Sequence, residues 1–101
     1  MNFATISVSA ATANTLISGV AGTTIRVKGV FWIALHATLQ SVTFQGSSSG
    51  TFTGAMLSVA GVPHEMSPSS MSWFETVAGE DLDITLAHAS QVSGVILYEQ
   101  D

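Results

Sequence analysis

Apolar and polar side chains alternate along several short stretches of this chain. In Phe3–Ser9, Ala4, Ile6 and Val8 alternate with threonine and serine, and in Leu82–Leu86 aliphatic residues alternate with aspartate and threonine. A period of two places the two sets of side chains on opposite faces of a β-strand. The 3.6-residue period and the capping residues of long helices are nearly absent. The pattern therefore predicts an all-β protein.

Clusters of glycine, proline and serine divide the chain into about eight such strands. The expected strands are Phe3–Ser9, Thr15–Val20, Thr24–Leu35, Ser41–Gln45, Thr51–Leu57, Met71–Val77, Leu82–Leu86 and Gln91–Glu99. We expect Ser58–Pro68 to be a loop, and residues 46–50 and 78–81 to be turns. Short strands at this spacing are typical of a sandwich or a barrel, and the spacing leaves jelly-roll and immunoglobulin-like sandwiches open.

The segment Val30–Leu35 is apolar at every position and follows Gly29, which interrupts the preceding alternation. A glycine inside a strand often marks a bulge or a bend. A strand that has no polar face is expected to be covered on both sides. One side would then face the core, and the other would face a neighbouring subunit.

Two pairs of adjacent aromatic residues, Phe31–Trp32 and Trp73–Phe74, lie in expected strands. Neighbours on a strand point to opposite faces, so one member of each pair should point outward. Large outward aromatic side chains usually mark contact surfaces. These four residues, together with His36 at the end of the apolar run, are therefore the candidate subunit or capsid contacts. The alternative is that the pairs lie at bulges or beneath loops.

Charged residues are scarce, at 9% of the chain against roughly a quarter in an average soluble domain. A small domain has much surface for its volume, and charges normally cover it. The composition therefore indicates a surface that is buried against partners, or else a neutral surface rich in serine and threonine. With 101 residues and no cysteine, the chain has room for one domain and no disulfide to reinforce it.

The net charge of −5, with only Arg26 and Lys28 basic, argues against several partners and compartments. Nucleic acids and anionic membranes both require a basic surface, so we expect neither as a partner. The N-terminal residues show no basic start followed by an apolar stretch, so no signal peptide is predicted. We expect synthesis in a cytosol.

The serines and histidines do not form a recognisable catalytic motif. Residues 46–50 join two expected strands rather than a strand and a helix, which favours a hairpin turn over a nucleophile elbow. His36, His64 and His88 are far apart in sequence and lack metal-ligand spacing, although two of them could still meet in space. We therefore expect no enzyme activity, no cofactor and no metal.

One acidic cluster, Glu80, Asp81 and Asp83, offers oxygen atoms of the kind that calcium prefers. The spacing of an EF-hand loop is missing. We favour a tight turn through Gly79, Glu80 and Asp81, with Asp83 on the solvent face of the following strand.

Several strand and turn motifs resemble those of a group of small tailed-phage virion proteins. They are Thr24-Ile25-Arg26-Val27, Val42-Thr43-Phe44, Trp73-Phe74-Glu75-Thr76 with Gly79-Glu80-Asp81-Leu82, and Gln91-Val92-Ser93-Gly94-Val95 with Tyr98. The resemblance covers Gly22 to Tyr98, and more loosely the chain is similar to the jelly-roll decoration (cement) proteins of phage heads. Residues 1–20 lie outside it and are expected to be an N-terminal arm or an edge strand.

The resemblance implies a single jelly-roll domain over residues 1–101 that assembles as a homotrimer. It further implies a protein that is made in the host cytoplasm, binds the major capsid protein on the outer head surface and stabilises neighbouring capsomers. A tail or fibre component that binds receptor carbohydrate is the alternative, because exposed tryptophan and tyrosine stack on sugars and lectins share this architecture. A small hydrolase is a third alternative that no catalytic motif supports.

Overall fold

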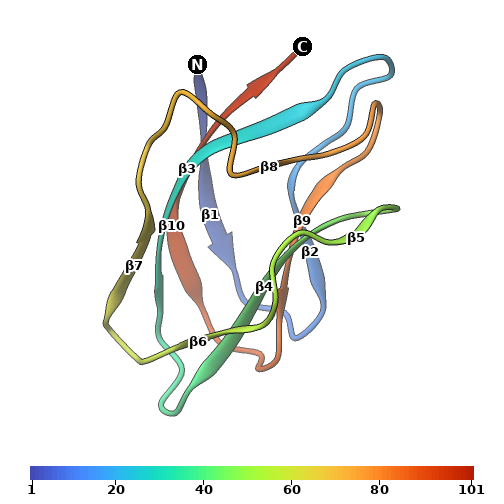
Figure 1. Cartoon of the computed structure of the whole chain (residues 1–101). Coiled ribbons are helices and arrows are strands. Elements are labelled where there is room, and N and C mark those ends of the chain that lie inside the picture. Colours follow the sequence, from blue (N-terminus) through green and yellow to red (C-terminus); the bar gives the residue numbers. More distant parts are fainter.

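Two antiparallel sheets face each other in the computed structural model, which describes residues 1–101 (Figure 1). Sheet A contains β1 (Asn2–Val8), β10 (Val92–Gln100), β3 (Ile25–Ala34) and β7 (Pro63–Met66) in that spatial order, and the short β8 (Phe74–Glu75) also pairs with β3. Sheet B contains β2 (Ala13–Ile17), β9 (Leu82–Leu86), β4 (Gln40–Gly46) and β5 (Gly50–Thr51), and β6 (Met56–Ser58) also pairs with β4. The predicted all-β sandwich is confirmed. No helix of the kind that could cross a membrane is present.

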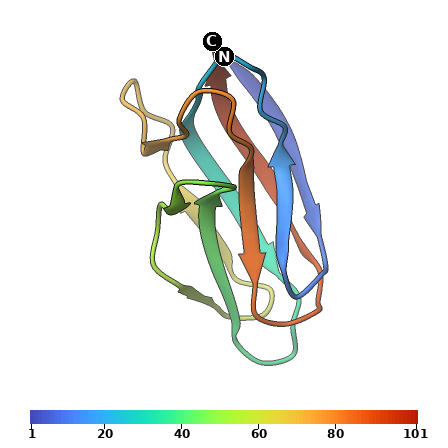
Figure 2. The same cartoon turned by 90° about the vertical axis from the view of Figure 1, so that its right-hand side faces the viewer.

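The strand pairs are nested along the chain. At the centre β4 pairs with β5 and β6, then β3 pairs with β7 and β8, then β2 with β9, and β1 with β10 is the outermost pair. Successive pairs belong to opposite sheets, and the pairings β3–β10 and β4–β9 join them into two continuous sheets. Both chain termini lie at the same end of the sandwich (Figure 2).

The hydrophobic core lies between the sheets and receives alternate side chains from both. Fourteen buried apolar residues form it, and the β9 side chains Leu82, Ile84 and Leu86 are among them, as their alternation predicts. The rings of Trp32 and Phe44 meet edge to face across the two sheets with centroids 5.6 Å apart. Burial of each such side chain stabilises the folded chain by roughly 1.5–3 kcal/mol. The alternating apolar residues therefore supply most of the stabilising contact between the sheets.

Ten strands replace the expected eight for two reasons. The expected strand Thr51–Leu57 is split into β5 and β6, because the amides of Phe52 and Thr53 both bond to the carbonyl of Phe44 and interrupt the ladder. The expected loop Ser58–Pro68 was wrong, since it contains β7, which pairs with the middle of β3. A proline is tolerated at the start of an edge strand, where Pro63 stands.

The expected strand Met71–Val77 was also wrong in length, because only Phe74 and Glu75 pair, with Val27 and Arg26. The residues before β8 form a loop that crosses β3 close to Gly29. A Cβ on Gly29 would lie 3.1 Å from the Cα of Pro68 in this loop.

The irregularity expected at Gly29 is present as a register shift between β3 and β10. Leu97 pairs with Gly29, whereas Tyr98 pairs with Val27, so Lys28 is the extra residue. The Lys28 ammonium donates to the carbonyl oxygen of Ser70 at 3.0 Å, which holds the crossing loop in place.

Gly94 provides a test of the β3–β10 contact. A Cβ at this position would overlap the carbonyl oxygen of Phe31 and lie 2.8 Å from the Cα of Trp32. These are backbone atoms of a paired strand and cannot move without disturbing the ladder. We expect Gly94→Ala to lower the free energy of unfolding by about 2 kcal/mol, measured by urea denaturation.

Gly54→Ala is the matched control, because a Cβ on Gly54 has no atom within 4 Å. This variant should stay within about 0.5 kcal/mol of the parent. Equal stability of the two variants would contradict the close approach at Gly94.

Candidate functional site

The charged residues are absent from one end of the sandwich. The loops that follow β1, β3, β6 and β9 gather at the end opposite the termini (Figure 2). These loops, residues 9–12, 35–39, 59–62 and 87–91, contain no Asp, Glu, Lys or Arg, and we call them the uncharged end. Depletion of charge is the compositional mark of the centre of a protein interface.

Large aliphatic side chains are exposed at the uncharged end and on the adjoining β6. They are Leu35 (57% exposed), Leu39 (45%), Leu57 (63%), Val59 (50%) and Val62 (45%). Single exposed apolar residues are normal, but several on neighbouring loops mark an interaction site. The loops therefore present a neutral apolar surface that is suited to contact with another macromolecule.

Hydrogen bonds between the loops fix the shape of the uncharged end. The amide of Leu35 donates to the carbonyl of Gln91 at 3.0 Å, and the amide of Gly61 donates to the carbonyl of Ala34 at 2.9 Å. The fully buried side chain of Gln40 bonds both to the carbonyl oxygen of His88, at 2.8 Å, and to its amide, at 2.9 Å. A surface that is ordered in advance loses less conformational entropy when it binds.

His36, a predicted contact residue, lies at the uncharged end and meets a second histidine there. The rings of His36 and His88 are stacked with centroids 4.3 Å apart and planes 8° from parallel. Ring-nitrogen lone pairs lie in the ring planes, so two parallel rings do not converge on one ion. The structure contains no group of three His, Cys, Asp or Glu residues that could hold a metal.

His36 also hydrogen-bonds a serine, since its Nδ1 lies 2.8 Å from the hydroxyl oxygen of Ser90. A serine nucleophile with a histidine base needs a further group, usually a carboxylate, to orient the imidazole. The loops of the uncharged end contain no carboxylate. The pair therefore stabilises the loop contact between residues 36 and 90.

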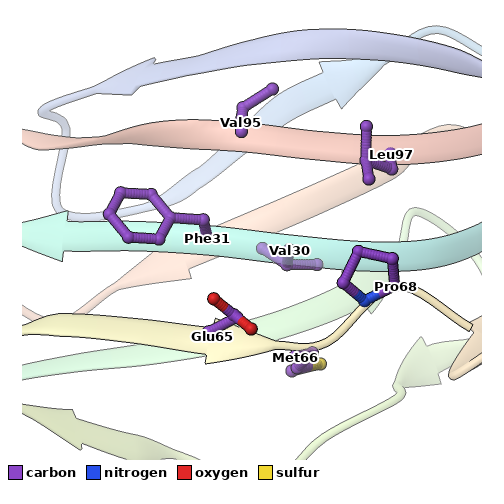
Figure 3. Close-up of a pocket in the computed structure, with 7 residues that line it drawn as sticks. All are labelled: Val30, Phe31, Glu65, Met66, Pro68, Val95 and Leu97. Atoms are coloured by element: carbon purple, nitrogen blue, oxygen red, sulfur yellow. The ribbon is translucent and has the colours of Figure 1, made fainter.

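A second apolar surface lies on the outer face of sheet A. A shallow groove is lined by Val30, Phe31, Glu65, Met66, Pro68, Val95 and Leu97 (Figure 3). The ladder places Phe31 beside Val95 of β10 and Glu65 of β7. Phe31 is 37% exposed. Its side chain is therefore accessible for the contact with a neighbouring subunit that the sequence predicts on this side of β3.

Within each aromatic pair the two side chains point to opposite faces, as expected, so only one member of each pair is accessible. Phe31 and Trp73 point outward, and Trp73 is 52% exposed. Trp32 was wrongly counted as a contact residue, because it is 3% exposed and its Nε1 donates to the Ser58 hydroxyl at 3.1 Å inside the core. Phe74 also faces inward, where its ring stacks on Phe52 with centroids 5.3 Å apart.

His64 and Asp83 do not occupy the positions that the sequence suggested. His64 belongs to the segment expected to be a loop, but it lies in β7, where its ring stacks on that of Trp32 with centroids 5.4 Å apart. Asp83 was placed on a solvent face, but it is only 7% exposed between Thr15 and Gln45 of the adjacent strands, and its Oδ1 has no hydrogen-bond partner. In both cases side chains of the neighbouring strands pack against the residue, and the pattern of its own strand does not show this.

Both basic residues are engaged within the chain. Arg26 forms an ion pair with Asp101, and the Lys28 ammonium lies 3.3 Å from a Glu99 carboxylate oxygen. The positive charges that a phosphate backbone requires are therefore already paired.

Glu80 joins two loops near the terminal end of the sandwich. Its carboxylate accepts hydrogen bonds from the amides and hydroxyls of Ser48 and Ser49, and from the amide of Val77 at 3.1 Å. Burial alone would raise the pKa of Glu80, but the bonds from the two serines outweigh burial and lower this pKa from 4.5 to about 2. The favoured turn is confirmed, since Glu80 bonds back to Val77 and Gly79 has a φ of 81°.

The exposed aliphatic residues of the uncharged end were missed by sequence reasoning. The signal that could have found them is the absence of any charge between Lys28 and Glu65, a segment that includes two loops of the uncharged end, residues 35–39 and 59–62. Alternation and aromatic content direct attention to strands, whereas this site is built from loops that converge only in the folded chain.

Comparison of the chain with known protein families, curated proteins and solved structures found no match. The resemblance to phage virion proteins therefore depends on the strand and turn motifs quoted above.

Glu80 predicts the acid sensitivity of the fold. Its pKa in the folded chain lies below the value of 4.5 expected in the unfolded chain. The ionised carboxylate therefore stabilises the fold above pH 4.5, and this contribution is lost as the pH falls toward 2. Glu80→Gln keeps the shape of the side chain without its charge, so it should unfold at a lower temperature at pH 7 and lose less stability between pH 4.5 and 2.

Glu75→Gln is the control, because Glu75 is exposed on β8. Thermal denaturation followed by circular dichroism at several pH values should give this variant the same acid profile as the parent. An unchanged acid profile in Glu80→Gln would show that the loop contact does not depend on ionised Glu80.

Proposed function

We propose that the chain is a structural protein of a tailed-phage virion, a decoration (cement) protein that binds the outer head surface and stabilises neighbouring capsomers. It binds the major capsid protein through the uncharged end and carries out no catalysis. It is made in the host cytoplasm and becomes part of the virion. The observation that carries the proposal is the neutral apolar surface at one end of a sandwich whose few charges lie elsewhere.

The chemistry of the uncharged end supports a permanent structural contact. Apolar burial contributes roughly 25 cal/mol for each Å² removed from water, and salt does not screen it as it screens charge pairs. A protein that must stay attached to a shell outside the cell needs a contact of this kind. The virion assignment itself comes from the resemblance of Gly22–Tyr98.

The strand order supports the jelly-roll type within the sandwich class. Jelly rolls are double-sheet folds of eight principal strands. Here the nested pairs alternate between the sheets, so that the chain resembles one long hairpin rolled onto itself. The resemblance also implies threefold assembly, which is a prediction separate from the capsid contact and is an alternative to the twofold contact proposed below.

The proposed contact can be tested with a double variant, Leu35→Ser/Val62→Ser. Both side chains are exposed, so their removal should leave the fold intact, whereas it removes apolar area from the uncharged end. We expect at least tenfold weaker binding, about 1.4 kcal/mol, to phage heads that lack the protein. Co-sedimentation with such heads measures the affinity, and electron microscopy locates the bound protein.

Val20→Ser/Val77→Ser is the matched control, because these two valines are similarly exposed but lie outside the uncharged end. It should bind like the parent. Equal binding by the two double variants would exclude the uncharged end as the contact, and density on the tail alone would exclude the head location.

A tail or fibre component that binds carbohydrate is the second candidate, and Trp73 favours it. The indole Nε1 donates to the carbonyl of Ser67 at 2.9 Å, which holds the exposed ring in one orientation. A fixed, exposed aromatic face is a surface on which a sugar ring can stack. A glycan array should then show binding that Trp73→Ser abolishes, and an array without signal would exclude this candidate.

A further inference from the structure

The outer edge of β1 is free along its whole length. β1 pairs with β10 on one side through all seven of its residues, from Asn2 opposite Tyr98 to Val8 opposite Val92. No strand pairs with its other side. In Figure 2, β1 and β2 run along one side of the sandwich with nothing beyond them. Alternate N–H and C=O groups of β1 therefore point to solvent without a strand partner.

The remaining sheet edges carry features that hinder pairing with another chain. β7 begins with Pro63 and carries the charged Glu65, and Pro68 follows it. β2 has a shift of register between Thr15 and Ile17. The other edge segments, β5, β6 and β8, are only two or three residues long. Proline, charge, bulges and shortness are the usual protections of an edge strand.

β1 has none of these protections. It is long for an edge, contains no charged residue and no proline, and pairs with β10 without a register shift. An unprotected edge of this kind is a template for a further strand. The contrast with every other edge indicates that β1 is kept open for a specific partner.

We propose that the partner is β1 of a second copy of this chain, paired antiparallel about a twofold axis at Thr5. In this register Thr5 lies opposite Thr5 of the second copy, Phe3 lies opposite Ser7, and Ala4 lies opposite Ile6. Such a contact is isologous, since each copy contributes the same residues and the assembly closes at two chains. It joins the two copies of sheet A into one continuous sheet.

The sequence of β1 fits this register on both faces. Because the twofold axis is perpendicular to the sheet, inward-facing Ala4 and Ile6 meet inward-facing residues of the second copy. On the outer face, the two Thr5 side chains form a cross-strand threonine pair, which is a favourable combination. Phe3, 71% exposed in the single chain, gains a neighbouring strand beside its ring.

This contact is separate from the surface assigned to the capsid. It uses the main chain of β1 and leaves Leu35, Leu39 and Val62 at the uncharged end accessible. It does not depend on the proposed function, and either can fail without the other.

The absence of cysteine makes disulfide trapping a direct test. In the proposed register, Thr5→Cys brings two thiols opposite each other, within reach of a disulfide. Ser7→Cys on the same face is the control, because the two positions would be about 14 Å apart at 3.4 Å per residue. Mild oxidation should convert most of the Thr5→Cys protein, and little of the Ser7→Cys protein, into a covalent dimer.

Solution mass gives a second and independent measurement. The unmodified chain of 10.5 kDa should sediment as a dimer of about 21 kDa. Thr5→Lys places two like charges opposite each other and should raise the dissociation constant at least tenfold, whereas a mixture of Thr5→Lys and Thr5→Glu should form the dimer again. Circular dichroism confirms that each variant is folded.

A monomeric mass at all concentrations would overturn the proposal. So would a mass of three chains with no cross-link in Thr5→Cys, which would instead support threefold assembly through other surfaces. Equal cross-linking of Thr5→Cys and Ser7→Cys would contradict the register and the twofold axis.

Discussion

The pairing of β3 with β10 is the contact on which the rest of this structure depends. β3 ends the first third of the chain and β10 ends the chain itself, so their ladder closes the nested hairpin and turns it into a sandwich. The two strands approach so closely at Gly94 that no larger residue fits. The same closure brings the loops after β1, β3, β6 and β9 to one end and leaves β1 at an open edge. Together with the β4–β9 ladder of sheet B, this ladder therefore positions both proposed contact surfaces.

The existence of a strand and its buried apolar face could be predicted where apolar residues alternate. Leu82–Leu86 and the segment that ends at Glu99 are examples, because a period of two identifies the apolar side chains that reach the core. Features that depend on a partner strand could not be predicted. β7 has a proline at its start and no alternation, and pairing with β3 alone makes it a strand. Asp83 alternates as a solvent-facing residue, and the flanking strands cover it.

The candidate site was only partly predictable for the same reason. Adjacent aromatics guarantee that one of each pair points outward, but the identity of the outward residue depends on register, which placed Phe31 and Trp73 outside and Trp32 and Phe74 inside. The apolar loops at the uncharged end come from four places in the chain. Their convergence is a property of topology, which local patterns do not contain.

Both basic residues and several of the acidic residues of this protein form contacts within the chain. Arg26 pairs with Asp101, Lys28 pairs with Glu99, and Glu80 ties two loops together. All three contacts lie away from the uncharged end, and they order the turns and strand ends that neighbour the termini. Charged side chains that are paired within a domain contribute little to the electrostatic steering of a partner. Association must then rely on shape, apolar area and exposed main-chain groups. The uncharged end supplies the first two, and the free edge of β1 supplies the third.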